Sequence, residues 1–345
     1  MLNDVQLNQR FSRINNAGLI LKYGGISIGY GNWNDWWGPG LHNSLVMSNN
    51  SQGFFNFFIE NPNYTKVFKN FYGKAKYSIS DKFINFLGAD FYLSSLSFEG
   101  KVSNIKFGYS KNVLSGGYVD LKWSMSDALL TILSKKNMKY WDTISDYYIL
   151  ATFPKSNIEL FIEIGVLDRS FLEREPGIYA NHNTGSNIGF RKKNIFGIES
   201  MLIGSEYTRL VQSIYYNIIP TSNWYDNIKY NFSSFNGRRW AAHSGSDSDD
   251  LIFFVGFSSD ISSFIYGINY ERHGVNHHFP PEVKIETRLS VNYNFNNISI
   301  SIYYENEYFE HYGFVDSSQN VWNKTFEEGS LQRTKTILFS LGFNL

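Results

Sequence analysis

The feature that most constrains this chain is the strict alternation of apolar and polar residues along successive segments. In residues 285–295 every odd position except Thr287 is apolar, and the even positions are Glu286, Arg288, Ser290, Asn292 and Asn294. The pattern restarts in residues 298–308 with isoleucine and tyrosine. Because side chains on a strand point alternately to its two faces, each segment has one apolar and one polar face. Long, aromatic-rich strands of this kind predict a closed barrel in an outer membrane.

The same alternation recurs along the chain. It is clear in residues 157–167, 251–258, 262–272 and 333–345. Further candidate strands are 18–30, 54–60, 72–80, 82–94, 101–109, 116–126, 146–153, 186–192 and 198–209, with two more within 213–233. We therefore expect an all-β fold: a transmembrane antiparallel up-and-down β-barrel of about 16 strands. Residues 1–345 are expected to form a single domain, with one short helix near 127–139 capped by Ser126 or Asp127.

The connections between the predicted strands alternate in length over the C-terminal half. Short turns are expected at 155–157, 258–260 and 296–297, and longer polar connections at 168–185, 210–250, 273–282 and 309–332. Short turns at one rim and long loops at the other are typical of outer-membrane barrels. Near residues 31–53 the sequence does not determine which strands run up and which run down the barrel. Large residues on the inward faces, Tyr92, Tyr118 and Phe161, predict a lumen that is at least partly filled.

Composition excludes several classes of protein. The 31 basic and 31 acidic residues balance, so nothing favours a nucleic-acid partner, and the absence of cysteine excludes disulfides and thiolate metal sites. No apolar run reaches the length of a membrane-spanning helix, so a membrane protein of this sequence has to be a barrel. A soluble propeller would show blade repeats, and none is found. The start at Met1 shows no signal segment, so we expect a mature form or a fragment lacking its start.

The most distinctive local string is Asn34-Asp35-Trp36-Trp37-Gly38-Pro39-Gly40. Its indole rings could stack on pyranose faces while Asp35 binds hydroxyl groups, which makes these residues candidates for carbohydrate binding. Alternatively, the tryptophans anchor the barrel at the membrane interface or pack as a plug inside the lumen.

A second candidate site is the polar string from Gly237 to Asp250. Two guanidinium groups could bind an acidic sugar bidentately, and the aspartates could hold Ca²⁺, although the spacing of a calcium loop is missing. A solvated, self-paired loop is the alternative. The carbohydrate candidates here are Arg238, Arg239, Trp240, Asp247 and Asp249. His273, His277 and His278 cluster in the next connection, where an exposed polar loop is favoured over a metal site. We expect no metal and no cofactor.

Four carboxylates are expected to face the lumen: Glu163, Asp168, Glu206 and Glu271. A pair of them, Glu163 and Asp168, could in principle hydrolyse a glycosidic bond. Inward carboxylates in barrels more often pair with inward arginine or lysine, and we favour that role. No serine-nucleophile motif or nucleotide-binding motif is present, so the chain is not expected to be an enzyme.

These residues resemble landmarks of the Wzi family of outer-membrane capsule-assembly proteins. The most specific is Trp36-Trp37-Gly38-Pro39-Gly40 followed by Ser44-Leu45-Val46-Met47-Ser48-Asn49-Asn50. Looser ones are Pro154 with Glu159 to Asp168, Gly197-Ile-Glu199 through Glu206-Tyr207-Thr208, the string from Gly237 to Asp250, and Tyr270-Glu271-Arg272-His273-Gly274. The resemblance spans roughly residues 18–345. It implies an 18-stranded barrel, a surface lectin that holds capsular polysaccharide, and N-terminal strands and plug helices that this chain lacks.

Three functions remain open from the sequence. The first is a carbohydrate-binding barrel in the bacterial outer membrane that attaches capsular or exopolysaccharide, contacts outer-membrane lipid and acts as a monomer. The second is a porin-like diffusion channel, because the inward residues are polar. The third, an outer-membrane glycan hydrolase using Glu163 or Asp168, is the least favoured because these carboxylates resemble ordinary lumen charges.

Overall fold

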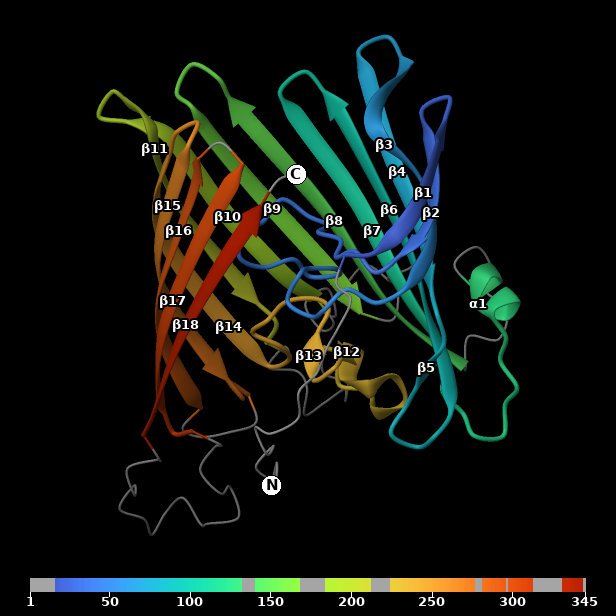
Figure 1. Cartoon of the computed structure of the whole chain (residues 1–345). Helices are drawn as coiled ribbons and strands as arrows, with labels where there is room; N and C mark the ends of the chain where they lie inside the picture. Colours follow the sequence, from blue (N-terminus) through green and yellow to red (C-terminus); the bar gives the residue numbers. More distant parts are fainter. Residues whose placement is uncertain are drawn as a thin grey trace, which may run out of the picture.

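The computed structural model describes residues 16–131, 140–167, 184–211, 224–276, 281–295, 297–312 and 331–343. One antiparallel sheet of 16 strands, counted within these ranges, curves around a lumen (Figure 1). Strands that follow one another along the chain pair with one another, which confirms the predicted up-and-down order and strand number. The wall consists of β1 (Gly18–Tyr23), β2 (Ile26–Gly31), β3 (Asn56–Phe68), β4 (Phe71–Ser80), β6 (Asp90–Val102), β7 (Ile105–Gly116), β8 (Trp141–Phe153), β9 (Ile158–Leu167), β10 (Thr184–Ile195), β11 (Ile198–Arg209), β14 (Ser248–Ser258), β15 (Ser262–His273), β16 (Glu282–Phe295), β17 (Ile298–Glu310) and β18 (Gln332–Phe343), with β5 (Phe83–Ile84) paired to β6.

The short connections share one rim and the long connections share the other (Figure 1). At the short-turn rim, Gly24 and Gly25 join β1 to β2 with φ values of 57° and 83°. Such positive values match the mirror-image turns that fit the twist of antiparallel strands. The long connections leave strand ends that point toward the lower rim of Figure 1; the one between β2 and β3 crosses the middle of the lumen, and the β12–β13 hairpin (Ser234–Phe235 and Arg238–Arg239) between β11 and β14 lies lower.

Four predicted strands are wrong in detail. Residues 101–109 contain the turn at Ser103 and Asn104 that joins β6 to β7. Residues 18–30 form the hairpin β1–β2 because the two glycines turn the chain. Residues 82–94 are interrupted by a turn ending at Gly88, whose φ is 79°. Residues 116–126 are not a strand: Gly116 and Gly117 have φ values of 95° and 77°, which end β7.

The predicted helix is present as α1 (Met125–Thr131), and residues 132–139 lie outside the described part. Its cap is Ser124 rather than the predicted Ser126 or Asp127. The Ser124 hydroxyl accepts the Asp127 backbone N–H at 3.3 Å, and the Asp127 carboxylate accepts the Ser124 backbone N–H at 2.9 Å. This reciprocal pair satisfies two otherwise free donors at the start of the helix. Within the described ranges no helix is both long and apolar enough to cross a bilayer.

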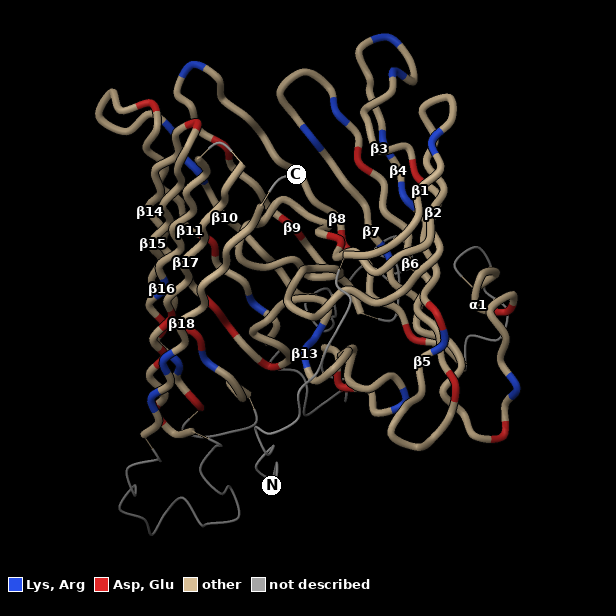
Figure 2. Tube along the Cα trace, viewed as in Figure 1, with Lys and Arg blue, Asp and Glu red and all other residues tan. Residues whose placement is uncertain are grey.

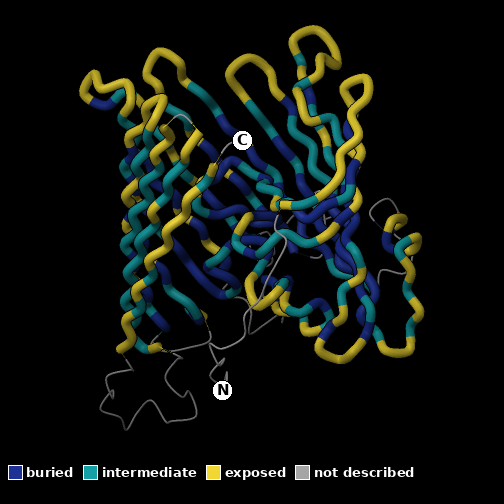
Figure 3. The backbone as a smooth tube through the Cα atoms, viewed as in Figure 1, coloured by how far each residue is buried: buried dark blue, intermediate teal, exposed yellow. Residues whose placement is uncertain are grey.

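The alternation of the sequence is expressed as two different faces of the wall. On β15, Tyr266, Ile268 and Tyr270 are exposed on the outer face, whereas Asn269 and Glu271 are buried on the inner face. Buried or half-buried positions alternate with exposed ones along several strands of the wall (Figure 3). Charged positions occur part-way along the strands, not only at their ends (Figure 2).

Two long connections fold back into the lumen and form what we call the plug. The first plug segment is residues 32–55, between β2 and β3. The second is residues 224–247, which includes the 3-10 helix η4 (Ile228–Ser233) and the hairpin of β12 (Ser234–Phe235) and β13 (Arg238–Arg239). The segments bind each other: the Ser48 N–H donates to Trp240 O at 2.7 Å, and the Ser48 hydroxyl to Ala241 O at 2.6 Å. Part of residues 213–233, expected to be strands, is thus irregular; 212–223 lie outside the described part.

The plug brings an apolar core into the lumen, which the polar-inward pattern does not predict. Its buried members come from both plug segments and from the inner faces of strands near the long-loop rim; they include Trp37, Leu45, Phe91, Leu93, Leu114, Trp224 and Trp240. An inward apolar side chain is tolerated there because the plug, not water, covers it. The lumen is therefore filled over this part of its length.

Aromatic rings lie across glycines of the neighbouring strand, on the inner face in each case except Phe107, which shares the outer face with the exposed Ile149. Five directly opposed pairs share this arrangement: Gly29 with Phe58, Gly100 with Phe107, Gly108 with Tyr148, Gly189 with Phe161, and Gly204 with Phe254. A Cβ placed on any of these glycines would lie 2.0–2.5 Å from the facing ring. The rings therefore need the glycines in order to lie flat against the wall.

Candidate functional site

A row of buried polar side chains crosses the inner wall and positions the plug. Its members are direct cross-strand neighbours on six adjacent strands, β9, β10, β11, β14, β15 and β16: Glu163, Asn187, Thr208, Asp250, Glu271 and Lys284. All six are buried. Buried polar groups require hydrogen-bond partners, and here the first plug segment supplies many of them.

The wall carboxylates hold the main chain of the first plug segment. Glu163 accepts the backbone N–H of Leu45 at 3.0 Å, and Glu206 accepts those of Leu41 and His42, the latter at 2.9 Å. The Asn43 side chain continues the contact by donating to Asp250 at 2.7 Å. Hydrogen bonds to a carboxylate are among the stronger ones in proteins, so these contacts fix the segment at a set depth in the lumen.

The structure places three of the four predicted lumen charges on this inner wall. Glu271 pairs with Lys284 at 3.1 Å, as expected for an inward carboxylate. Glu163 and Glu206 differ from Glu271 in their partners. They accept hydrogen bonds from backbone amides of the plug instead of pairing with a lysine. Asp168 lies outside the described residues.

The three carbohydrate candidates of the string Asn34 to Gly40 lie in three different environments. Trp37 is 6% exposed and belongs to the apolar core. Trp36 lines a cavity and donates its indole N–H to Gly40 O at 2.9 Å. Asp35 pairs with Lys76 at 2.7 Å. The two rings therefore do not form one continuous platform, and Trp37 has the packing role named above as the alternative.

The predicted residues of the second string also separate. Trp240, 2% exposed, packs in the core, and Arg239 lies 3.8 Å from Asp226. Asp247 accepts the Asn276 backbone N–H at 3.1 Å, and Asp249 accepts the Arg272 side chain at 2.8 Å. These carboxylates diverge, so they do not form the calcium loop considered from the sequence. Of the predicted carbohydrate-binding residues of this string, Arg238 lines a cavity.

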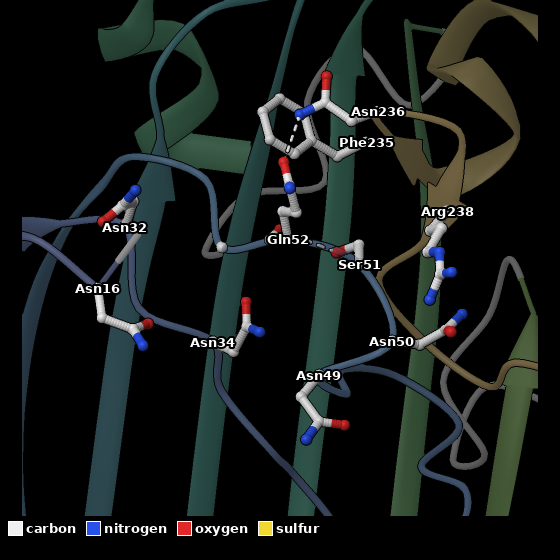
Figure 4. Close-up of a pocket in the computed structure, with 11 residues that line it drawn as sticks. Asn16, Asn32, Asn34, Asn49, Asn50, Ser51, Gln52, Phe235, Asn236 and Arg238 are labelled. Carbon is white, nitrogen blue, oxygen red and sulfur yellow. Dashed lines mark hydrogen bonds between the residues drawn. The ribbon is translucent and has the colours of Figure 1, made fainter. Parts of the chain in front are cut away.

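That cavity lies between the first plug segment and the β12–β13 hairpin. Its volume is about 510 Å³, and most of its lining side chains are amides (Figure 4). The lining residues, here called the amide cavity, are Asn16, Asn32, Asn34, Asn49, Asn50, Ser51, Gln52, Gly53, Phe235, Asn236 and Arg238. The hairpin that forms one wall lies toward the long-loop rim (Figure 1).

Some of these amides shape the cavity and others are free to bind. Asn236 donates to Gln52 at 3.1 Å, and Asn50 donates to Arg239 O at 3.0 Å. Within the described residues, the side chains of Asn34, Asn49 and Arg238 make no hydrogen bond. A carboxamide offers both a donor and an acceptor, and a guanidinium offers only donors. The cavity can thus bind a ligand that is rich in hydroxyl groups.

A second cavity of about 550 Å³ lies on another side of the first plug segment. It is lined by Trp36 and His42 of the plug, and by wall residues of both charges, including Glu99, Lys106, Arg191 and Arg288. Asn49 lines both cavities, so the first plug segment is the partition between them.

Sequence reasoning missed most residues of the amide cavity and of the polar row. Asn49 and Asn50 were included only as family landmarks, and Asn34 as part of the Trp-Trp string. A signal for the row exists, because Asn187, Thr208 and Asp250 are inward by alternation in the predicted strands or next to them. Their alignment depends on strand register across long connections, which the sequence does not specify.

Comparison with known proteins places the fold. No family model and no curated protein matches the sequence. Among solved structures, the chain is similar to Wzi from Escherichia coli, an outer-membrane protein involved in group 1 capsule assembly that is described as a carbohydrate-binding β-barrel. The TM-score is 0.67 at 12% sequence identity, over 86% of this chain and 66% of that chain. The fold is therefore Wzi-like, which confirms the predicted resemblance at the level of architecture, and the chain spans just under two thirds of that protein.

Proposed function

We propose that this protein is an outer-membrane barrel that binds capsular or exopolysaccharide at the cell surface through the amide cavity. The observation that supports it best is the cavity lined by seven carboxamides, of which Asn34 and Asn49 are free to bind. Sugar hydroxyl groups donate and accept hydrogen bonds, as carboxamides do. The similarity to Wzi agrees with this function.

The orientation of the molecule supports access from outside the cell. Long loops are extracellular in outer-membrane barrels, and both plug segments enter the lumen from the long-loop rim. The exposed apolar outer face, which includes Tyr266 and Ile268, suits contact with lipid. We take the chain to act as one domain and as a monomer.

Arg238 suggests the class of sugar. It is exposed, without a hydrogen bond in the described part, and stands at the edge of a cavity that is otherwise neutral. A guanidinium binds a carboxylate bidentately, so an acidic monosaccharide unit is favoured over a purely neutral one. The Phe235 side chain adds an aromatic surface for a sugar ring.

A glycan hydrolase that uses Glu163 is disfavoured by the burial of that carboxylate. Hydrolysis needs two carboxyl groups on either side of the glycosidic bond. The Glu163 side chain is fully buried and accepts hydrogen bonds from Leu45 and Asn187, so it is not available to a sugar. A diffusion channel is disfavoured by the plug and its apolar core.

Binding to polysaccharide extracted from the surface of the source bacterium tests the proposal. The full chain in detergent is expected to bind it, and Asn34→Ala/Asn49→Ala and Arg238→Ala are each expected to weaken binding about tenfold, the effect of roughly 1.4 kcal/mol. The matched controls are Asn104→Ala, in an exposed turn, and Arg209→Ala, exposed at the end of β11. Equal affinity of wild type and cavity variants, or loss only in the controls, would contradict the proposal.

A further inference from the structure

Four side chains with metal-ligand chemistry converge where the plug meets the wall. They are His42 of the first plug segment, His243 of the second, Asp250 of β14 and Glu271 of β15. One ligand atom from each lies within 4.8 Å of all the others. Sequence analysis predicts no metal site because these histidines are 201 positions apart; the fold brings them together.

The distances between ligand atoms suit a small divalent cation. His42 Nε2 lies 3.3 Å and His243 Nε2 lies 3.5 Å from Asp250 Oδ2, and His243 Nε2 lies 2.7 Å from Glu271 Oε1. Zinc bonds to imidazole nitrogen and carboxylate oxygen are about 2.0–2.2 Å, which places tetrahedral ligands roughly 3.3–3.6 Å apart. Two of these three distances already match. The other pairs of ligand atoms lie within 4.8 Å, so side-chain movements are needed to bring all four to tetrahedral spacing.

Two buried atoms of the cluster make no hydrogen bond. Within the described part of the chain, Asp250 Oδ1 has no hydrogen-bond partner. His42 Nε2, whose side chain is 4% exposed, has a 3.3 Å contact with Asp250 Oδ2 that does not have hydrogen-bond geometry. Leaving such atoms buried and unpaired is unfavourable. A cation at the centre of the cluster would satisfy His42 Nε2, and it would also satisfy Asp250 Oδ1 if that carboxylate bound through both oxygens.

The surroundings orient His243 as metal-binding histidines are usually oriented. Its Nδ1 lies 2.8 Å from Asn43 Oδ1, and the same oxygen accepts the His243 backbone N–H at 3.1 Å. An amide oxygen only accepts, so Nδ1 carries the hydrogen and Nε2 faces the cluster. A hydrogen bond from the second ring nitrogen to an acceptor is typical of metal-ligating histidine.

The local charge also favours a cation. Lys284 Nζ contacts Glu271 at 3.1 Å, Glu286 at 2.9 Å and Glu307 at 3.3 Å, and His273 Nε2 contacts Glu271 at 3.0 Å. Two basic groups therefore serve three carboxylates before Asp250 is considered. The 2.7 Å contact between His243 and Glu271 needs a proton on Nε2 when no metal is bound. A divalent ion would replace that proton. His42 also lines the 550 Å³ cavity, which offers an entry path.

We propose that His42, His243, Asp250 and Glu271 form a zinc-type metal site that cross-links both plug segments to the barrel wall. Imidazole and carboxylate ligands suit zinc among the common divalent ions, and the absence of cysteine leaves no thiolate alternative. The ion would connect four parts of the chain that are far apart in sequence. Its effect would be on the stability and fixed position of the plug.

Metal titration of the tag-free full chain in detergent, freed of metal with a chelator, tests the site. We expect one zinc ion per chain, a rise in Tm on zinc addition, and visible absorption typical of four-coordinate cobalt when Co²⁺ is used instead. His42→Ala and His243→Ala should each weaken zinc binding at least tenfold. His311→Ala is the control, because that histidine follows β17 and is not in the cluster.

Asp250→Asn keeps the size of its side chain and serves if the histidine variants do not fold; it should also weaken zinc binding. Failure of the wild-type chain to bind zinc at micromolar concentration would overturn the site. So would unchanged affinity in the histidine variants together with a loss in His311→Ala. The site shares no ligand with the amide cavity, so Asn34→Ala/Asn49→Ala should bind zinc like wild type, whatever happens to its glycan affinity.

Discussion

At the scale of single residues, the plug is held by carboxylates that bind main-chain amides. Glu206 is the clearest case, because its two oxygens accept the N–H groups of Leu41 and His42 and approach that of Asn43 at 3.5 Å. A turn of the chain is thereby bound to a buried acceptor-only group. This arrangement gives the first plug segment a defined position without needing a complementary charged side chain.

Glu206→Gln should loosen this turn. The carboxamide keeps the shape of the side chain, but it turns an NH₂ group toward N–H donors, leaving at least one donor unpaired at a cost of about 1–3 kcal/mol. We expect amide exchange at Leu41 and His42 to accelerate roughly tenfold or more by hydrogen-exchange mass spectrometry. Glu199→Gln, exposed on the same strand, should leave it unchanged. Equal protection in both variants would show that Glu206 does not hold the turn.

At the scale of elements, the opposed glycine–aromatic pairs fix how neighbouring strands pack. A Cβ on Gly189 would lie 2.5 Å from the Phe161 ring, whereas one on Gly73 would meet nothing closer than 3.4 Å. Gly189→Ala should therefore lower the denaturant midpoint of unfolding, since displacing a packed ring costs about 1–3 kcal/mol. Gly73→Ala should change it by much less. The prediction fails if the two alanine variants unfold alike.

The start of α1 offers a second test at this scale. Hydrogen bonds from Ser124 hold the pKa of Asp127 below its usual range. The folded pKa is therefore lower than the unfolded one, so the contribution of this carboxylate is present above about pH 4 and is lost as pH falls through the folded value. Ser124→Ala should speed exchange of the α1 amides about fivefold at pH 7, from a cap loss of about 1 kcal/mol. In the wild type, protection of α1 should fall on acidification, and protection that is independent of pH would contradict this.

The elements show how far sequence alone reaches. Alternation in β14 to β18 is long and uninterrupted, so these strands are predicted within a few residues. Near the N-terminus, glycines such as Gly24 and Gly116 turn the chain inside apolar runs, and their effect depends on positive φ values rather than on apolar pattern. Alternation along the strands also predicted that the side chains of Glu163, Glu206 and Glu271 point into the lumen.

The candidate sites were harder to predict than the wall. The amide cavity combines residues 16–53 with residues 235–238, and the histidine cluster combines positions 42, 243, 250 and 271. Both depend on how two irregular segments fold back into the lumen. No periodicity describes such segments, and their positions are set by contacts that are distant in sequence. Trp37 and Trp240 show the same limit, because a buried ring and an exposed one look alike in sequence.

At the scale of the whole molecule, the plug joins the inner wall over several adjacent strands and closes that part of the lumen. The wild-type protein in planar bilayers should therefore show no porin-size conductance. Glu163→Gln/Glu206→Gln, which removes two contacts to the first plug segment, should produce intermittent openings. Glu199→Gln is again the control. Steady, large conductance of the wild type would instead favour the diffusion channel.

Holding a loop by its peptide groups has a consequence for how such a protein can change over generations. A carboxylate that accepts hydrogen bonds from backbone N–H groups does not depend on the side chains of those residues, because every residue except proline has this N–H group. Residues of the first plug segment whose side chains line the amide cavity, such as Asn34 and Asn49, are thus free to vary while Glu163 and Glu206 stay the same. Ligand preference can then drift from strain to strain upon an unchanged scaffold.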